Sequence, residues 1–178
     1  MKKVLLIATV QSHICQFHRP LVAMLHEHGC EVHVAARNNL AEKNGLKLDF
    51  VEQVFDVPFQ RSPFSPKNLG AYKQLKKIID EGGYNVVHCN TPVGGVLGRL
   101  AARKVRRHGT KVFYTAHGFH FYKGSPKKNW LIWYPVEKFM CRHTDKLITI
   151  NEEDYQLARS RFRVETCHIH GVGVSMSR

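Results

Sequence analysis

The run KVLLIATV, from Lys3 to Val10, decides the fold of this 178-residue chain. Its apolar residues follow one another without polar alternation, which is typical of a strand buried on both faces of a parallel sheet. A second run, Lys146–Ile150 within DKLITIN, has the same character. Five further short apolar runs predict strands at Cys30–Ala36, Glu52–Val57, Asn85–Asn90, Lys111–Ala116 and Cys167–Val172.

Helical patterns separate most of these strands. They cover Phe17–His28, Pro66–Glu81, Val93–Arg107 and Pro126–Cys141. Asn151 is placed as the N-cap of a further short helix, and Pro135 predicts a kink or a break near Leu131. The order of elements predicts an α/β, Rossmann-like, doubly wound fold, with a mainly parallel sheet and helices on both faces, in one domain over residues 1–172.

The composition limits the possible partners. The chain has 27 Lys and Arg against 14 Asp and Glu, a formal net charge of +13, which favours nucleic acid, anionic lipid headgroups or phosphorylated small molecules. The basic residues are dispersed and no RNP, KH or zinc-finger spacing is present, so nucleic-acid binding is kept only as an alternative. Five cysteines without a C-x-x-C pair indicate a reducing compartment and neither a disulfide framework nor a zinc ribbon. The run Cys167–His170 resembles a metal site, but alternation along a strand favours a plain strand there. No apolar stretch reaches the roughly 18 residues of a spanning helix.

Candidate site residues follow the strands, because ligands of doubly wound folds bind beyond the carboxyl ends of the strands. They are Ser12, His13 and His18 after the first strand, Asn90 and Thr91 at the fourth, and His117, Gly118, Phe119, His120 and Tyr122 after the fifth. Imidazoles suit acid/base catalysis or hydrogen bonds to hydroxyls, whereas a loop that packs its own aromatic rings is the alternative. The first strand is not followed by G-x-G-x-x-G and no P-loop exists, which argues against NAD and FAD.

Three glycines near the start of the third helical pattern, Gly94, Gly95 and Gly98, have two interpretations. They either leave backbone N–H groups free for an anion or allow the helix to pack closely on the sheet. The pattern does not distinguish the two.

The fourth helical pattern places aromatic rings beside lysines. These residues are Lys127, Lys128, Trp130 and Trp133. Such a helix suits contact with an anionic membrane, where rings lie at headgroup level, and packing of the rings in the core is the alternative.

Four segments, taken in order, resemble the N-terminal domain of family 4 glycosyltransferases of the GT-B fold, of the bacterial capsular and exopolysaccharide type. They are YNVVHCNTPVGGVLGRLAAR, VFYTAHGFHFYKGSPKKNW, YPVEKFMCRHTDKLITINEEDY and HGVGVS. The resemblance runs from Met1 to about Ser175, and the order and spacing of the segments make it specific.

The resemblance implies a retaining transferase that needs no metal or other cofactor. It would move a sugar from a nucleotide-sugar donor to an acceptor, often a lipid-linked saccharide in surface polysaccharide biosynthesis. This domain would hold the acceptor, and the candidate residues above would line its cleft, with Ser12 and His13 in a loop that closes over it. His117 matches a family histidine that faces the donor sugar, which makes it the catalytic residue. The protein would lie in the cytoplasm, peripheral to the inner face of the plasma membrane.

The family's motif of paired glutamates and its Arg/Lys pair for the donor diphosphate belong to the C-terminal domain, and no two glutamates here have that spacing. Residues 173–178 resemble the start of the hinge into that domain, with Ser175 in place of an aspartate. We therefore expect the chain alone to be inactive without a donor-binding domain. The alternative is a non-catalytic, membrane-associated subunit of a split transferase that recruits a separate donor-domain chain.

Overall fold

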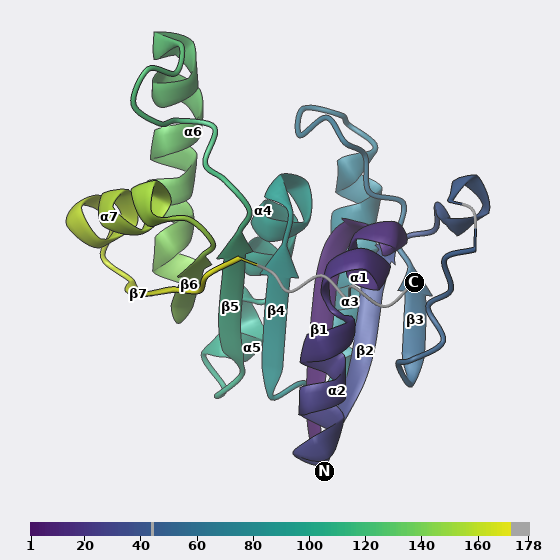
Figure 1. The fold of residues 1–178 in the computed structure, drawn as a ribbon. Coiled ribbons are helices and arrows are strands. Elements are labelled where there is room, and N and C mark those ends of the chain that lie inside the picture. Colours follow the sequence, from purple (N-terminus) through teal and green to yellow (C-terminus); the bar gives the residue numbers. More distant parts are fainter. Residues whose placement is uncertain (44, 172–178) are drawn as a thin grey trace.

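The computed structural model describes residues 1–43 and 45–171, which form one seven-stranded sheet with helices packed on it. The strand order is β3-β2-β1-β4-β5-β6-β7, and all neighbouring strands are parallel (Figure 1). The strands are β1 Lys2–Val10, β2 Cys30–Arg37, β3 Gln53–Asp56, β4 Val86–Asn90, β5 Lys111–Ala116, β6 Lys146–Thr149 and β7 Glu165–His168. The predicted doubly wound sheet is confirmed.

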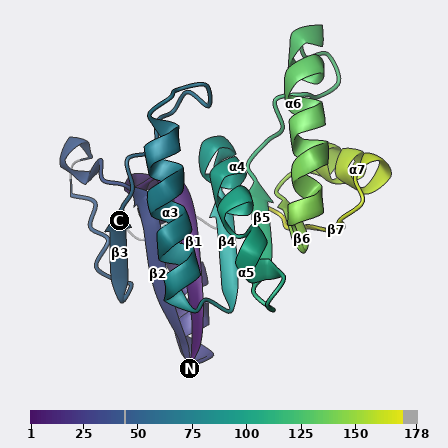
Figure 2. The same ribbon diagram turned by 180° about the vertical axis from the view of Figure 1, so that it is seen from behind.

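Helices cover both faces of this sheet, as predicted. They are α1 Gln11–Phe17, α2 Arg19–Glu27, α3 Asn68–Gly82, α4 Pro92–Ala101, α5 Arg103–Arg106, α6 Lys127–Met140 and α7 Glu152–Arg161, with 3-10 turns η1 Leu40–Glu42 and η2 Cys141–His143. Figure 2 shows α3, α4, α5 and α6 on one face, whereas α1 and α2 lie on the other (Figure 1). The first turns of α6 extend beyond the carboxyl edge of the sheet.

The apolar run of β1 serves two separate cores. Leu5 and Ile7 belong to the cluster that includes residues of α3 and α4, and Val4, Leu6 and Ala8 belong to the cluster that includes residues of α1 and α2. All five are buried. A central strand between two helical layers therefore needs apolar residues at successive positions, which explains why the run does not alternate.

The chain after β1 differs from the prediction of a loop followed by one helix. α1 begins directly at Gln11, and a junction at His18 separates it from α2. Pro20 lies in the first turn of α2, where its missing N–H is tolerated, but it cannot donate the bond that would continue α1. The pattern 93–107 likewise divides at Ala102, and β7 begins at Glu165 rather than at the predicted Cys167.

The predicted N-cap of α7 and the predicted effect of Pro135 on α6 have different outcomes. Asn151 caps α7, because its Oδ1 accepts a bond from the N–H of Asp154 at 2.8 Å. α6 continues through Pro135, so of the kink or break predicted near Leu131 the break does not occur. Leu131 is 79% exposed, and water can bond the carbonyl that proline leaves without a helical donor. The hinge predicted at residues 173–178 lies outside the described residues.

Candidate active site

Three histidines meet at the carboxyl edge of the sheet. His13 comes from α1, His18 joins α1 to α2, and His117 follows β5. The Nε2 atoms of His13 and His117 are 3.3 Å apart, and the ring centroids of His13 and His18 are 5.3 Å apart. The fold thus brings His117 next to His13, which lies 104 residues earlier in the chain, and next to His18.

Burial keeps these imidazoles neutral. Desolvation, helped by His117 and His18, lowers the pKa of His13 to about 3. Desolvation and His18 lower the pKa of His117 to about 4. The pKa of His88 on β4 falls to about 3, chiefly because of burial, and burial also lowers that of His18. At neutral pH the cluster therefore presents hydrogen-bond donors and acceptors rather than positive charge.

Three predicted cleft residues lie behind this surface. Ser12, His18 and Asn90 are buried. The N–H of Ser12 donates to Oδ1 of Asn39 at 3.0 Å, and Nδ2 of Asn39 donates to the Ser12 hydroxyl at 2.9 Å. Nε2 of His18 is 3.0 Å from Oδ1 of Asn90. These bonds hold α1 in place, and Ser12 lies in a helix rather than in the predicted closing loop. The acceptor contacts predicted for the three residues stay a prediction.

The start of α4 is fixed to the end of β1. Thr91 has a φ of +63°, which a β-branched residue rarely adopts, and its hydroxyl accepts a bond from the N–H of Thr9 at 3.0 Å. A Cβ atom at Gly94 would lie 3.2 Å from the backbone of Ala8, and one at Gly98 only 2.6 Å from a cysteine sulfur on β4. These distances support the close-packing interpretation of the glycines.

The segment after β5 has a buried part and an exposed rim. Gly118 has a φ of +132°, a conformation that favours glycine, and allows the chain to turn. Phe119 and Phe121 are 7% and 0% exposed, and their rings stack with centroids 4.9 Å apart. The ring of Phe119 anchors the segment in the core, and its predicted acceptor contact stays a prediction. His120 and Tyr122 are exposed and stay candidate contacts.

A cavity of about 220 Å³ lies between the segment after β3 and α6. His120, Trp133 and Arg61 are among its lining residues. Complete small-molecule pockets measure about 300–1,000 Å³, so this cavity suits one part of a larger cleft. The sequence analysis did not select Arg61, although it follows the third predicted strand, where the same rule for carboxyl ends applies.

A buried ion pair connects α4 to α6. The guanidinium of Arg99, which is 0% exposed, donates to both carboxylate oxygens of Glu137, at 2.9 and 3.1 Å. Its Cζ also lies 3.9 Å from the centroid of the Tyr114 ring. Burial alone would lower the pKa of Arg99, but the Glu137 carboxylate raises it, so the pair is charged. This pair fixes the position of α6 against the sheet.

The exposure of side chains along α6 bears on the two interpretations of its aromatic residues, membrane contact and packing in the core. Trp130 and Trp133 are half-buried and pack against the core, as the alternative predicted. The exposed apolar side chains are Leu131 and Ile132, beside the exposed lysines of the first turn. No helix within the described ranges has the length and apolar character needed to cross a bilayer. In residues 1–43 and 45–171, no three metal-ligating side chains are arranged to hold an ion.

Comparison with known families shows what kind of protein carries this site. Residues 3–151 match the sequence profile of the family described as "Glycosyl transferase 4-like". The chain belongs to this family. The predicted resemblance to family 4 glycosyltransferases is confirmed.

Two curated proteins are similar in sequence to this chain. The "Putative glycosyltransferase EpsD" of Bacillus subtilis (strain 168) is 55% identical over 179 residues, which cover 99% of this chain and 45% of that protein. The "UDP-Gal:alpha-D-GlcNAc-diphosphoundecaprenol alpha-1,3-galactosyltransferase" of Escherichia coli is 28% identical over 137 residues, 74% of this chain and 35% of that protein. The chain thus spans less than half the length of either relative.

Solved structures agree with the fold. The crystal structure of Anabaena HepE in complex with UDP and glucose aligns with a TM-score of 0.63 and 16% identity, over 98% of this chain and 45% of that one. At this identity the likeness concerns the fold alone. It fits the Rossmann-like half of a GT-B fold that the sequence predicted.

Proposed function

We propose that this domain holds the acceptor in the cleft of a retaining glycosyltransferase of exopolysaccharide biosynthesis. The observation that carries the proposal is the neutral pair of His13 and His117 at the carboxyl edge of a family 4 fold. Paired neutral imidazoles offer a donor and an acceptor to sugar hydroxyls without attracting free anions. The names of the relatives support transfer of a sugar as the reaction and a nucleotide-sugar as the donor.

We place the donor diphosphate on a second Rossmann-like domain across the cleft. The imidazoles around His117 are neutral, so they would not balance a diphosphate. The greater length of the relatives is in keeping with such a domain. His117 then bonds the transferred sugar and stabilises its oxocarbenium-like transition state through a preorganised hydrogen bond. Arg61, in the 220 Å³ cavity, suits a phosphate of a lipid-linked acceptor.

Replacing His117 by alanine is expected to lower kcat about tenfold to a hundredfold, the effect of losing a hydrogen bond to a developing charge. His117→Gln keeps a neutral donor and acceptor and is expected to retain more activity than His117→Ala. The assay measures sugar transfer by a full-length transferase that contains this domain, alongside thermal unfolding.

The control is His108→Ala, which removes an exposed histidine before β5, at the opposite edge of the sheet. It should leave kcat unchanged. Equal losses of activity in His117→Gln and His117→Ala would instead favour proton transfer by this histidine. A fall in stability that matches the fall in activity would favour a packing role.

We also propose that α6 contacts the cytoplasmic face of an anionic membrane. Leu131 and Ile132 are 79% and 43% exposed, and Lys127 and Lys128 lie one turn before them. Phe64, 76% exposed, extends this apolar surface, since its ring lies 6.2 Å from that of Trp133 on α6. α6 begins on the same edge of the sheet as the candidate active site, so membrane contact there would bring a lipid-linked acceptor to the cleft (Figure 1).

The double variant Leu131→Ser/Ile132→Ser is expected to bind vesicles of phosphatidylglycerol about tenfold more weakly, because it removes apolar area that would enter the bilayer. Sedimentation with vesicles measures the partition coefficient. Met24→Ser on α2 is the control, since it removes a 45% exposed apolar side chain from the opposite face. Equal binding by wild type and double variant would contradict a role of α6.

A further inference from the structure

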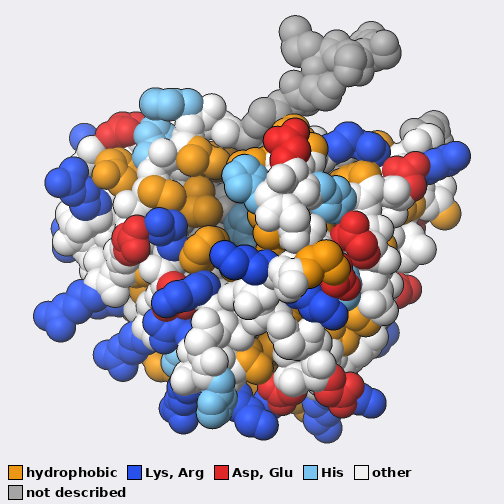
Figure 3. Space-filling model, turned by 90° about the horizontal axis from the view of Figure 1, so that it is seen from below, with side chains coloured by type: hydrophobic (Ala, Val, Ile, Leu, Met, Phe, Trp, Pro, Cys, Tyr) orange, Lys and Arg blue, Asp and Glu red, His pale blue; other side chains and the backbone are white. Residues whose placement is uncertain are grey.

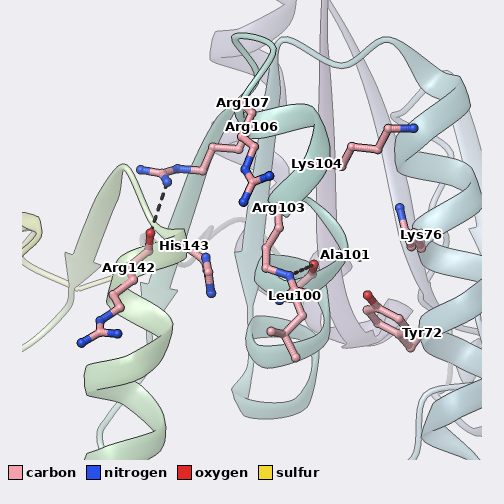
Figure 4. A pocket seen from close by; sticks show the side chains of 10 residues that line it. All are labelled: Tyr72, Lys76, Leu100, Ala101, Arg103, Lys104, Arg106, Arg107, Arg142 and His143. Atoms are coloured by element: carbon pink, nitrogen blue, oxygen red, sulfur yellow. Dashed lines mark hydrogen bonds between the residues drawn. The ribbon is translucent and has the colours of Figure 1, made fainter.

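A second cavity lies at the other end of the sheet. It measures about 510 Å³ and lies between α3, α5 and η2 (Figure 4). α5 precedes β5 and η2 precedes β6, so this cavity is at the amino edge, whereas the histidine cluster is at the carboxyl edge. Its volume is within the range of about 300–1,000 Å³ that small-molecule sites occupy.

The lining of this cavity is strongly basic. Six of its ten residues are Lys or Arg, and none is Asp or Glu. Two of the six are neutralised from outside the cavity: Arg106 pairs with Asp145 at 3.0 Å, and Lys76 pairs with Asp80 at 2.6 Å. The other four have no ion-pair partner within the described ranges: Arg103, Lys104, Arg107 and Arg142. Seen from the amino edge, Lys and Arg gather on the side where α5 and α6 lie (Figure 3).

A histidine of η2 adds an unsatisfied polar atom to this basic surface. Nε2 of His143 is buried and has no hydrogen-bond partner within the described residues. Burial, and then the charges of Arg103 and Arg106, lower the pKa of this imidazole. A neutral imidazole has one N–H donor and one acceptor nitrogen, so His143 can add a hydrogen bond to an anion that the neighbouring guanidinium groups attract.

The arrangement of the cations indicates which anion. Arg103 of α5 and Arg142 of η2 are both among the lining residues, so basic side chains reach the cavity from two separate elements. In Figure 4 the guanidinium of Arg142 is turned away from that of Arg103, toward α6. Guanidinium groups bind phosphate oxygens with two parallel bonds, and four unpaired cations need more than one negative charge. Tyr72 of α3 provides an aromatic ring on the opposite wall. We propose that this cavity is a binding site for a ligand with two or more phosphate charges, separate from the candidate active site.

The ligand is either a free phosphorylated molecule or the phosphorylated headgroup of a lipid, and two probes distinguish these sources. Inorganic pyrophosphate is titrated by calorimetry at 150 mM salt. Vesicles that contain cardiolipin, whose headgroup carries two phosphates, are tested by sedimentation, in a Leu131→Ser/Ile132→Ser background so that α6 does not contribute. We expect pyrophosphate to bind at one site per chain.

Arg103→Gln/Arg142→Gln is the test variant and Arg159→Gln/Arg161→Gln on α7 is its control, because both remove two exposed positive charges. The side chains of Arg103 and Arg142 form no ion pair in the described ranges, so the test variant should fold, which thermal unfolding verifies. The test variant is expected to bind pyrophosphate at least about tenfold more weakly, the effect of losing charge-assisted bonds. The control should bind within about twofold of wild type, since long-range charge effects are screened.

A third result would support the site with a lipid headgroup as its ligand. In that case the wild type does not bind pyrophosphate, and vesicle binding is lost in the test variant but not in the control. Equal loss in the two double variants would overturn the proposal, because binding would then follow net charge alone. So would failure of the wild type to bind either probe.

Discussion

Replacing Glu137 by alanine is expected to lower the free energy of unfolding by about 3–5 kcal/mol. The substitution leaves the guanidinium of Arg99 buried at 0% exposure without the carboxylate that accepts two of its bonds. The Tyr114 ring, 3.9 Å from the guanidinium carbon, does not replace a full negative charge. Urea unfolding followed by circular dichroism measures the loss.

Two further variants separate burial from charge. Asp80→Ala breaks the more exposed pair with Lys76, 2.6 Å long, and is expected to cost less than about 1 kcal/mol. Arg99→Met/Glu137→Leu removes both buried charges and is expected to cost less than Glu137→Ala alone, since apolar residues of similar volume can replace a buried pair. A loss below about 1 kcal/mol in Glu137→Ala would contradict the importance of this pair.

The buried pair also shows what the sequence could not predict. Arg99 and Glu137 are 38 residues apart, and each belongs to a pattern that reads as an ordinary amphipathic helix. Pairing across that distance depends on how α4 and α6 pack on β5, which local periodicity does not contain. The strands were predictable because their burial is visible in the local sequence. β1 is buried on both faces, and this burial requires a run of successive apolar residues.

The sequence predicted where the candidate site lies, but not which of its residues are buried and which are exposed. The rule that ligands bind at the carboxyl ends of parallel strands correctly brought His13, His18 and His117 to one edge. It could not tell that α1 starts without a loop, which turns His18 inward and leaves His13 half-buried. It also could not tell that Phe119 packs in the core, because an aromatic ring suits a cleft and a core equally well.

Acidification is expected to destabilise the domain by about 3 kcal/mol between pH 7 and pH 5.5. The folded-state pKa is about 3 for His13 and His88 and about 4 for His117, against the ordinary value of 6.5 in an unfolded chain. Below pH 6.5 the unfolded state therefore binds more protons than the folded state, and stability falls as pH falls. Each imidazole contributes at most about 1.4 kcal/mol per pH unit, and solvent screening reduces this for the half-buried His13 and His117.

The pH window identifies the histidines as the cause. Asp145 has a pKa that is lowered from 3.8; although burial raises it, bonds from Arg106 and the N–H of Val112 outweigh that effect. Its contribution is lost only as pH falls below about 4, a separate window from the histidines. Urea unfolding at pH 7 and at pH 5.5 is compared for wild type and His88→Gln, which has one fewer imidazole to protonate and should lose about 1 kcal/mol less on acidification. Stability that stays constant down to pH 5.5 would mean that the cluster accepts protons while folded, and His117 would then be available as a general acid.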